Sequence, residues 1–191
     1  MVQRTNSKDS IAMALFDEII DTHISEVTIT ALINRSKIAR RTFYNNFDNI
    51  YEVIVYLIDL IDEKLDTPNL DEGINGRAVT ASDVLDYLPE HIYENRDLLR
   101  VIYTTDLRGF WFNHVMEKYE KWMIKYLFSD YRSKVITKEV ACNVLLQTVI
   151  AAVDSWISKP VPDEPDQFRA VLLEILQVSP IGDLELSYEE K

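Results

Sequence analysis

The sequence predicts an all-α protein. Apolar residues recur at helical spacing along nearly the whole chain, and near the N-terminus Ile11, Leu15 and Ile19 form one i, i+4 row. The 191 residues include only four Gly and six Pro, which disfavours sheet folds with many tight turns. A chain of this length buries a real core as one domain or as two closely packed ones. We expect an N-terminal three-helix unit joined by a long helix to a C-terminal helical bundle.

Four helices are expected in the N-terminal third of the chain, at about 8–22, 29–35, 39–45 and 49–65. Asn6 or Ser7 is the expected N-cap of the first helix, Thr28 of the second and Asp48 of the fourth. The reason is that short oxygen-bearing side chains accept hydrogen bonds from the free N–H groups of a first helical turn.

Five further helices are expected, at about 82–95, 97–103, 106–128, 137–158 and 165–177. Pro89 should kink or break the first of these, Thr137 should cap the fourth, and Pro165 should begin the last. Residues 66–80 hold one Pro and two Gly and form the clearest loop, and the acidic tail 179–191 should be frayed.

The composition excludes several classes of protein. Cys142 is the single cysteine, so an internal disulfide and a multi-cysteine zinc site are excluded, and a reducing compartment is favoured. We find no run of 18 apolar residues that would span a membrane. The first ten residues lack the apolar core of a signal peptide. We therefore expect a cytoplasmic protein.

The charge is unevenly distributed along the chain. Twenty basic and 32 acidic residues give a net charge of −12, which argues against nucleic-acid binding because phosphates repel anions. Residues 1–50, however, hold six basic and six acidic side chains and are neutral, so residues 51–191, with 14 against 26, carry the whole excess. Four of the six N-terminal cations lie within 35–41, which indicates a special segment there.

Residues 28–47 carry the strongest functional signal. Two short helices joined by a tight turn, with basic residues at the start of the second, are the helix-turn-helix pattern. Arg40, Arg41 and Thr42 open the second helix, where side chains reach base edges in the major groove, and Arg there binds guanine through two hydrogen bonds. Tyr44 and Asn45 are placed to bind phosphates. The alternative for Arg40 and Arg41 is a solvent-exposed basic turn without DNA contact. The alternative for Tyr44 is a half-buried side chain that does not bind phosphate.

These residues resemble a family. With the apolar helix before it and the long helix after it, the segment from Thr28 to Phe47 is similar to the DNA-binding domain of TetR-type bacterial transcriptional repressors. The run Thr42-Phe43-Tyr44-x-x-Phe47 is the most specific part of the match, which covers about a quarter of the chain. The resemblance implies a helix-turn-helix domain over 1–48, an effector-binding and dimerisation domain over 49–178, and an acidic tail over 179–191.

Carried over by position, the resemblance implies a DNA-contacting set made of Thr28, Lys37, Arg40, Arg41, Thr42, Tyr44 and Asn45. Within it, Thr28 and Lys37 are expected near the DNA backbone, the next three face the bases, and the last two face phosphates. Phe43 and Phe47 would anchor the recognition helix in its core.

The chain also departs from the family pattern. Lys37 stands where a glycine is common in the turn, Ala39 where a Ser or Thr often caps the recognition helix, and Ile50 where a lysine often meets phosphate. The glycine common near the end of the first helix is absent from residues 21–24. These departures bear on DNA affinity more than on the fold.

The aromatic helix at 106–128 is the candidate wall of a small-molecule pocket, because helical bundles place such pockets between their helices. The candidate lining residues are Tyr103, Phe110, Trp111, His114, Trp122 and Tyr126. Plain core packing is the alternative for each of them.

The helix at 137–158 is apolar on most of its circumference. A helix with one solvent-exposed face is expected to be polar on that face. Paired with the last helix it gives an antiparallel hairpin, and the resemblance implies that this hairpin meets its two-fold mate in a four-helix homodimer interface. The candidate interface residues are Val144, Thr148, Ala152, Trp156, Phe168, Leu172 and Ile175. The two recognition helices would then lie about one DNA turn apart, or a multiple of it, on a near-palindromic operator.

The sequence gives no support for catalysis or for a cofactor. We find no P-loop, no glycine fingerprint, no paired-carboxylate motif and no Ser/His/Asp set. His23, His91 and His114 are scattered along the chain, so no metal site is expected. Cys142 lies on an apolar helix and is expected to be a buried small residue rather than a sensor thiol.

The sequence is therefore interpreted as a dimeric DNA-binding transcriptional regulator, a repressor that a small-molecule effector releases from its operator. The effector would bind preferentially to the conformer whose recognition helices are misspaced, and the long helix at 49–65 would transmit the change. One alternative is a degenerate family member that acts through protein–protein contacts. Another is a helical enzyme, which would need an unforeseen metal or cofactor.

Overall fold

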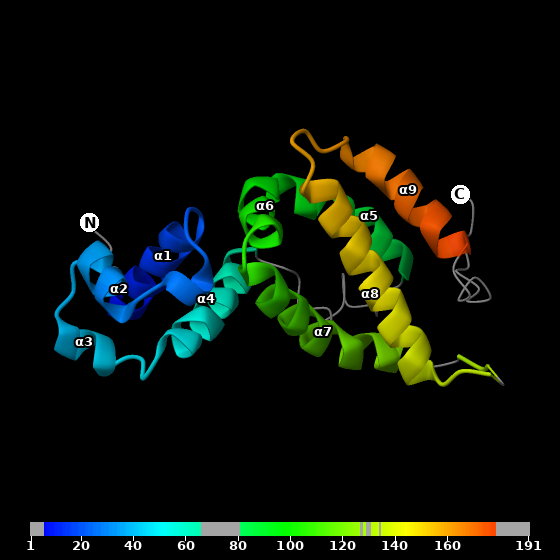
Figure 1. Ribbon diagram of the computed structural model, residues 1–191. Helices are drawn as coiled ribbons and strands as arrows, with labels where there is room; N and C mark the ends of the chain where they lie inside the picture. The colour runs from blue at the N-terminus through cyan, green and yellow to red at the C-terminus, as the bar shows by residue number, and fades with distance from the viewer. Residues whose placement is uncertain (1–5, 66–80, 127, 129–130, 134, 179–191) are drawn as a thin grey trace. The chain divides into compact units, whose positions relative to one another are not determined.

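The structure is a computed structural model that describes residues 6–65, 81–126, 128, 131–133 and 135–178 (Figure 1). Every regular element in these residues is a helix, which confirms the all-α prediction. The helices are α1 (Ser7–Ile19), α2 (Ile29–Ser36), α3 (Arg40–Tyr44), α4 (Ile50–Leu65), α5 (Ala81–Glu94), α6 (Arg96–Thr104), α7 (Leu107–Tyr126), α8 (Lys138–Ile157) and α9 (Pro165–Val178), with a 3-10 turn, η1 (Ile24–Glu26), between α1 and α2.

Three helices begin at predicted side-chain caps. The Asn6 side chain accepts from the Lys8 N–H, Thr28 from the Ala31 N–H and Thr137 from the Val140 N–H, as predicted. The predicted loop at 66–80 and the tail at 179–191 lie outside the described residues.

Two local predictions are corrected by the structure. The cap of α4 is Asn49, whose Oδ1 accepts from the Glu52 N–H at 3.1 Å, and not Asp48. The backbone N–H of Asp48 instead donates to the Glu52 carboxylate at 2.8 Å. Pro89 is buried inside α5, which continues through it from Ala81 to Glu94, so Pro89 does not break the helix.

The chain folds into two compact units. Unit 1 comprises Met1–Thr67 together with Val101–Trp111, and unit 2 comprises Pro68–Arg100 and Phe112–Lys191. The two units are defined by packing, and α4 belongs wholly to unit 1. The predicted division after residue 48 separates functions, and it stays a prediction.

Unit 1 is held together by α1, which packs against both α2 and α4. Its fully buried side chains come from each of these helices and from the later segment, and include Leu15, Leu32, Phe43, Leu57 and Leu107, all at 0% exposure. A core drawn from so many elements gives the short helices α2 and α3 a fixed support, which they need because helices of this length are marginal on their own.

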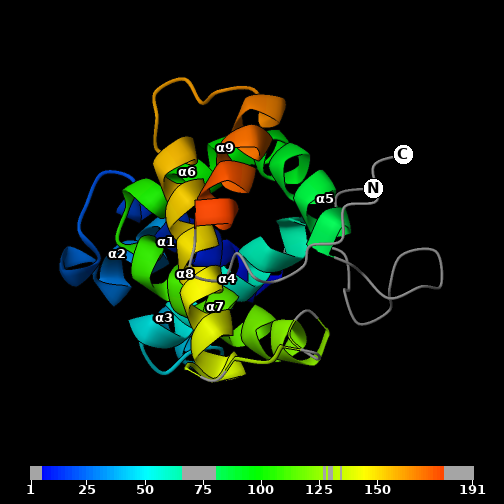
Figure 2. The same ribbon diagram turned by 90° about the vertical axis from the view of Figure 1, so that its right-hand side faces the viewer.

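Unit 2 is built on α9, which packs against α5 and α8 (Figures 1 and 2). Its centre contains a stack of aromatic side chains. The rings of Trp156 and Phe168 are parallel, with centroids 4.0 Å apart, and the Tyr93 ring stacks on the Trp156 ring at 6.1 Å. The Arg96 guanidinium lies 4.6 Å from the centroid of Tyr93. This stack joins α5, α8 and α9 into one body.

One helix of the described part, α8, has the length and mean hydropathy (1.6) of a membrane span. Seven of its residues are buried within unit 2, among them Leu146, Ile150 and Val153. A helix buried in a protein core has the same profile, so packing within unit 2 accounts for the apolar residues on the buried face of α8.

Candidate nucleic-acid interface

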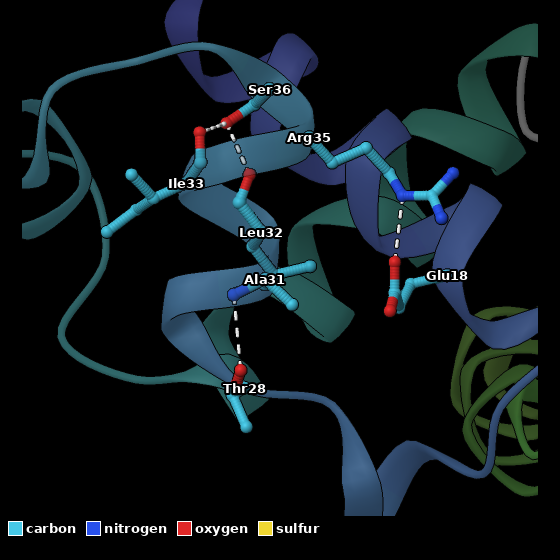
Figure 3. A network of polar contacts seen from close by, with 7 residues as sticks. All are labelled: Glu18, Thr28, Ala31, Leu32, Ile33, Arg35 and Ser36. Atoms are coloured by element: carbon cyan, nitrogen blue, oxygen red, sulfur yellow. Dashed lines mark hydrogen bonds and ion pairs between the residues drawn. The ribbon is translucent and has the colours of Figure 1, made fainter.

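Helices α2 and α3 form a helix-turn-helix. At the start of α2 the Thr28 Oγ1 accepts from the Ala31 N–H at 3.1 Å, and at its end the Ser36 hydroxyl donates to the Leu32 carbonyl at 2.6 Å (Figure 3). At each end of α2, one short polar side chain thereby hydrogen-bonds to the helix backbone. The Thr28 hydroxyl therefore has a structural role already, in addition to the DNA-backbone position predicted for it.

The turn between α2 and α3 depends on Lys37. Its φ of 55° and ψ of 34° make it the one non-glycine residue with positive φ in the described part of the chain. The left-handed conformation costs a residue with a Cβ about 1–2 kcal/mol. The Lys37 side chain is exposed and has no carboxylate within ion-pair distance among the described residues. Lys37 thus combines a costly backbone conformation with a charge that has no partner among the described residues. This combination makes it a candidate functional residue.

Helix α3 is anchored by two aromatic rings. Phe43 is fully buried and Phe47 nearly so, with ring centroids 6.1 Å apart. Ala39 precedes the helix and offers no side-chain cap, as predicted. The burial of Phe43 and Phe47 fixes which face of α3 points inward, and the opposite face is left to solvent.

Helix α3 and its C-cap Asn45 carry five of the seven predicted DNA-contacting residues. Arg40, Arg41, Tyr44 and Asn45 are exposed, and Thr42 is half-buried. The Arg40 Nη2 donates to the Tyr44 hydroxyl at 3.3 Å, and its guanidinium carbon lies 5.6 Å from the centroid of the Tyr44 ring. A guanidinium held by a ring one turn away loses less conformational freedom on binding.

The charges around this face are partly neutralised. Arg35, one of the four clustered cations, donates from Nε to Glu18 of α1 at 2.8 Å (Figure 3). This pair joins α2 to α1 and removes Arg35 from the set of available cations. The other three, Lys37, Arg40 and Arg41, have no carboxylate partner in the described residues.

A cation absent from the predicted set lies close by. The Lys8 ammonium, in the first turn of α1, is 5.6 Å from the centroid of Phe47 and 5.4 Å from that of Tyr56. The neighbouring Asp9 accepts a 2.6 Å hydrogen bond from the Tyr56 hydroxyl, which raises the pKa of Tyr56 to about 12. Sequence reasoning missed Lys8 because it lies almost 30 positions before the basic cluster, and only the fold places it beside Phe47.

The comparisons with known proteins agree with this geometry. No family model and no curated protein sequence matches the chain. A crystal structure of a TetR transcriptional regulator from Streptococcus agalactiae 2603V is similar to it, with a TM-score of 0.67 and 17% identity over 89% of this chain and 93% of that one. The chain has a TetR-type fold. The dihydroxyacetone kinase operon activator DhaS is similar as well, with a TM-score of 0.54 and 18% identity over the same shares.

The similarity of the TetR-type fold extends beyond residues 28–47. Since 89% of this chain is covered in both comparisons, the C-terminal helices share the arrangement as well as the first four. The sequence motif alone, at residues 28–47, covered only the helix-turn-helix. At 17% and 18% identity the likeness concerns the fold.

The six candidate pocket residues are divided between the two units. Tyr103 and Trp111 are buried and Phe110 is half-buried in unit 1, where the Phe110 ring lies 6.0 Å from that of Tyr51. In unit 2, His114 and Tyr126 are half-buried, and Trp122 is buried. The Trp122 and Tyr126 rings lie 5.7 Å apart. Their role as a pocket wall stays a prediction.

The candidate interface residues separate into an inner and an outer group. Trp156, Phe168 and Leu172 are 0–4% exposed and pack inside unit 2. Val144 is 42% exposed, and Thr148, Ala152 and Ile175 are half-buried. Helix α8 is apolar on most of its circumference, so its sequence does not distinguish the apolar residues that face inward from those that face outward.

The described residues give little support for a metal-binding site or a reactive cysteine. No group of three His, Cys, Asp or Glu side chains there is close enough together to hold a metal ion. Cys142 is fully buried, with its Sγ 3.7 Å from the Glu120 carbonyl, and burial raises its thiol pKa to about 11. A thiol with that pKa is almost entirely protonated near neutral pH and is a poor nucleophile.

Proposed function

We propose that this protein is a DNA-binding transcriptional regulator that binds a double-stranded operator through α3 and the turn before it. The observation that carries the proposal is the exposed face of the recognition helix, where Arg40, Arg41 and the strained Lys37 present cations without carboxylate partners. Phosphates supply most of the affinity of such proteins, and arginine pairs with guanine supply discrimination.

The remaining members of the DNA-contacting set have supporting roles in this proposal. Tyr44 holds Arg40 and is itself exposed, and Asn45 follows it at the end of α3, so both are placed to bind phosphates. Thr42 is the third candidate base contact, and Thr28 lies at the first turn of α2. Lys8, beside Phe47, adds a further cation to the same unit.

The proposal is tested by selecting binding sites from a random pool of double-stranded DNA with the purified protein. We expect an enriched, near-palindromic sequence and an affinity that falls steeply with ionic strength, because bound phosphates release counterions. The same protein should retard the DNA upstream of its own gene. Enrichment of no sequence, together with no retardation at low salt, would refute the proposal.

We further propose that the protein acts as a cytoplasmic repressor that an unidentified small-molecule effector releases from DNA. The fold is that of a TetR transcriptional regulator and of an operon activator, so regulation of transcription is the shared theme of those two proteins. An effector changes operator affinity only by its differential affinity for the two conformers. Removal of the gene should raise transcription from the bound promoter, whereas a fall would identify an activator.

The functional unit in this proposal is a homodimer formed through the outer face of α8 and α9. Val140 and Val144 are 49% and 42% exposed, and Ala151 is also exposed, so that these residues form one apolar stripe along α8. Val171 on α9, which packs against α8, is 49% exposed. Small and β-branched residues at helical spacing suit a close helix–helix contact.

Replacing Val144 by Arg is expected to produce a monomer. A charge in the centre of an apolar interface is left without a partner, and the loss of one of two linked DNA-binding units should lower operator affinity by about 100-fold or more. Sedimentation velocity and gel shifts measure the two effects. Val161→Arg is the matched control, since Val161 is 82% exposed in a loop of the same unit and should leave the dimer intact.

Replacing Lys37 by Gly should stabilise the protein and weaken its DNA binding. Glycine adopts the left-handed conformation without a Cβ clash, so the free energy of unfolding should rise by about 1 kcal/mol. The loss of one cation should reduce the salt dependence of binding by about one phosphate contact. Lys37→Arg, which keeps both the charge and the strain, should change neither quantity greatly. If Lys37→Gly binds DNA as tightly as the parent protein, Lys37 is not a phosphate contact.

The alternative function is regulation through protein–protein contacts without operator binding. The missing cap at Ala39 and the apolar Ile50 where a phosphate-binding lysine often stands favour it. The two functions differ in their salt dependence, because only phosphate contacts give a steep loss of affinity with ionic strength. We assign no enzymatic activity, cofactor or metal to the protein.

A further inference from the structure

Asp106 makes an unusual contact for a residue in its position. It directly precedes α7, where a short acidic side chain ordinarily accepts from the N–H groups of its own helix. Its Oδ2 instead accepts from the backbone N–H of Ile24 at 2.7 Å and lies 3.3 Å from the Nδ1 of His23. Thr105 takes over the first turn of α7, with its Oγ1 accepting from the Leu107 N–H at 3.4 Å.

The Asp106 carboxylate caps η1, which has no capping side chain of its own. Ile24 begins η1, and the preceding His23 makes no side-chain capping bond of its own. A free N–H at the start of a helical turn needs an acceptor, and Asp106 supplies it from 82 positions further along the chain. The pKa of the Asp106 carboxyl is lowered, mainly by the Ile24 N–H. Its ionised form is therefore the one that the fold stabilises.

The segment that carries Asp106 is fixed in unit 1 by its own packing. Leu107, the next residue, and Ile102 are both fully buried, and the Phe110 ring packs at 6.0 Å from Tyr51 of α4. Asp106 thus has a firm base from which to hold η1. Four residues beyond Ile24 is Thr28, the N-cap of α2, so η1 sets where the helix-turn-helix begins.

We propose that Asp106 is a positioning residue of the DNA-binding unit, which holds η1 through the Ile24 N–H and His23 and thereby fixes the placement of α2 and α3 for operator binding. The inference rests on the proposed DNA-binding function. Because Asp106 directly precedes α7, a displacement of the first residues of α7 also displaces the acceptor of the Ile24 N–H.

The test compares Asp106→Ala with Asp106→Asn in the full-length protein. Asp106→Ala removes the acceptor, so the Ile24 amide should exchange with solvent at least about tenfold faster, and affinity for the selected operator should fall about tenfold. Asp106→Asn keeps an acceptor oxygen of the same shape and should restore affinity to within about twofold of the parent protein. Amide exchange followed by NMR and gel shifts measure the two effects.

The matched control is Asp86→Ala. Asp86 accepts from Arg169 at 3.0 Å across a similar sequence separation of 83 residues, but it joins α5 to α9 within unit 2. Its loss should leave the Ile24 amide and operator affinity unchanged, which separates positioning from a general loss of stability. Circular dichroism establishes that each variant is folded at the temperature used.

The outcomes distinguish the two proposals. If Asp106→Ala binds the operator as tightly as the parent protein, or if Ile24 exchange does not change, Asp106 is not a positioning residue, and the DNA-binding function stands. If the parent protein binds no DNA, the proposed function fails and the positioning role fails with it. Faster exchange in Asp106→Ala would then show only that the contact exists in solution.

Discussion

Replacing Arg40 and Arg41 together by Ala is expected to abolish specific operator binding while leaving the protein folded and dimeric. Each arginine that pairs with guanine through two hydrogen bonds contributes about 1–3 kcal/mol of discrimination. The double variant should therefore lose at least about 30-fold in affinity. Both side chains are exposed, and exposed substitutions usually change the free energy of unfolding by less than about 0.5 kcal/mol.

The matched control for this variant removes the same charge elsewhere. Lys121 and Arg132 are exposed residues of unit 2, and their joint replacement by Ala leaves α3 unchanged. Gel shifts with the selected operator and with unrelated DNA of the same length separate specific from non-specific binding. Equal operator affinity in the Arg40/Arg41 variant and the parent protein would locate the DNA-binding surface outside α3.

Replacing Trp156 by Ala should cost about 3–5 kcal/mol of stability, because it removes a large side chain from a packed core. Trp156 is 2% exposed, stacks on Phe168 with centroids 4.0 Å apart, and donates from Nε1 to the Asp163 carbonyl at 2.9 Å. Urea unfolding followed by circular dichroism measures the loss. Trp156→Phe keeps a ring in the stack and should lose much less, and Val135→Ala, at an 89% exposed position, should lose nothing measurable.

The same variant separates an interior residue from an interface residue. If Trp156 belongs to the interior of unit 2, Trp156→Ala under native conditions keeps the dimer dissociation constant of the parent protein. If it belongs to the dimer interface, as its sequence suggested, sedimentation should show a monomer at concentrations where Trp156→Phe is still dimeric. Val144→Arg gives the reference value for a disrupted interface.

The elements predicted correctly from the sequence are those defined by nearest neighbours. A cap such as Thr28 acts on the residue three positions later, and the i, i+4 rows are visible in the chain itself, so the helices and the helix-turn-helix could be read directly. The left-handed conformation of Lys37 followed from the resemblance, which places a glycine there. Asp48 and Asn49 are both good caps, and the sequence did not distinguish two adjacent candidates.

The features that could not be predicted all join distant positions. The Arg35–Glu18 pair spans 17 residues and the Asp106–Ile24 bond spans 82, and neither leaves a periodic pattern. The direction of each side chain on α8 likewise depends on where α9 lies. The sequence therefore does not show that the candidate interface residues Trp156, Phe168 and Leu172 are buried within unit 2. Their part in a dimer interface stays a prediction.

The three tryptophans give each unit its own optical signal. Trp111 lies in unit 1, whereas Trp122 and Trp156 lie in unit 2, and all three are at most 7% exposed. Indole emission shifts to longer wavelength when the ring meets water, so the unfolding of either unit is visible in intrinsic fluorescence. A variant that retains Trp111 alone would follow unit 1, and one that retains Trp156 alone would follow unit 2, without an added dye.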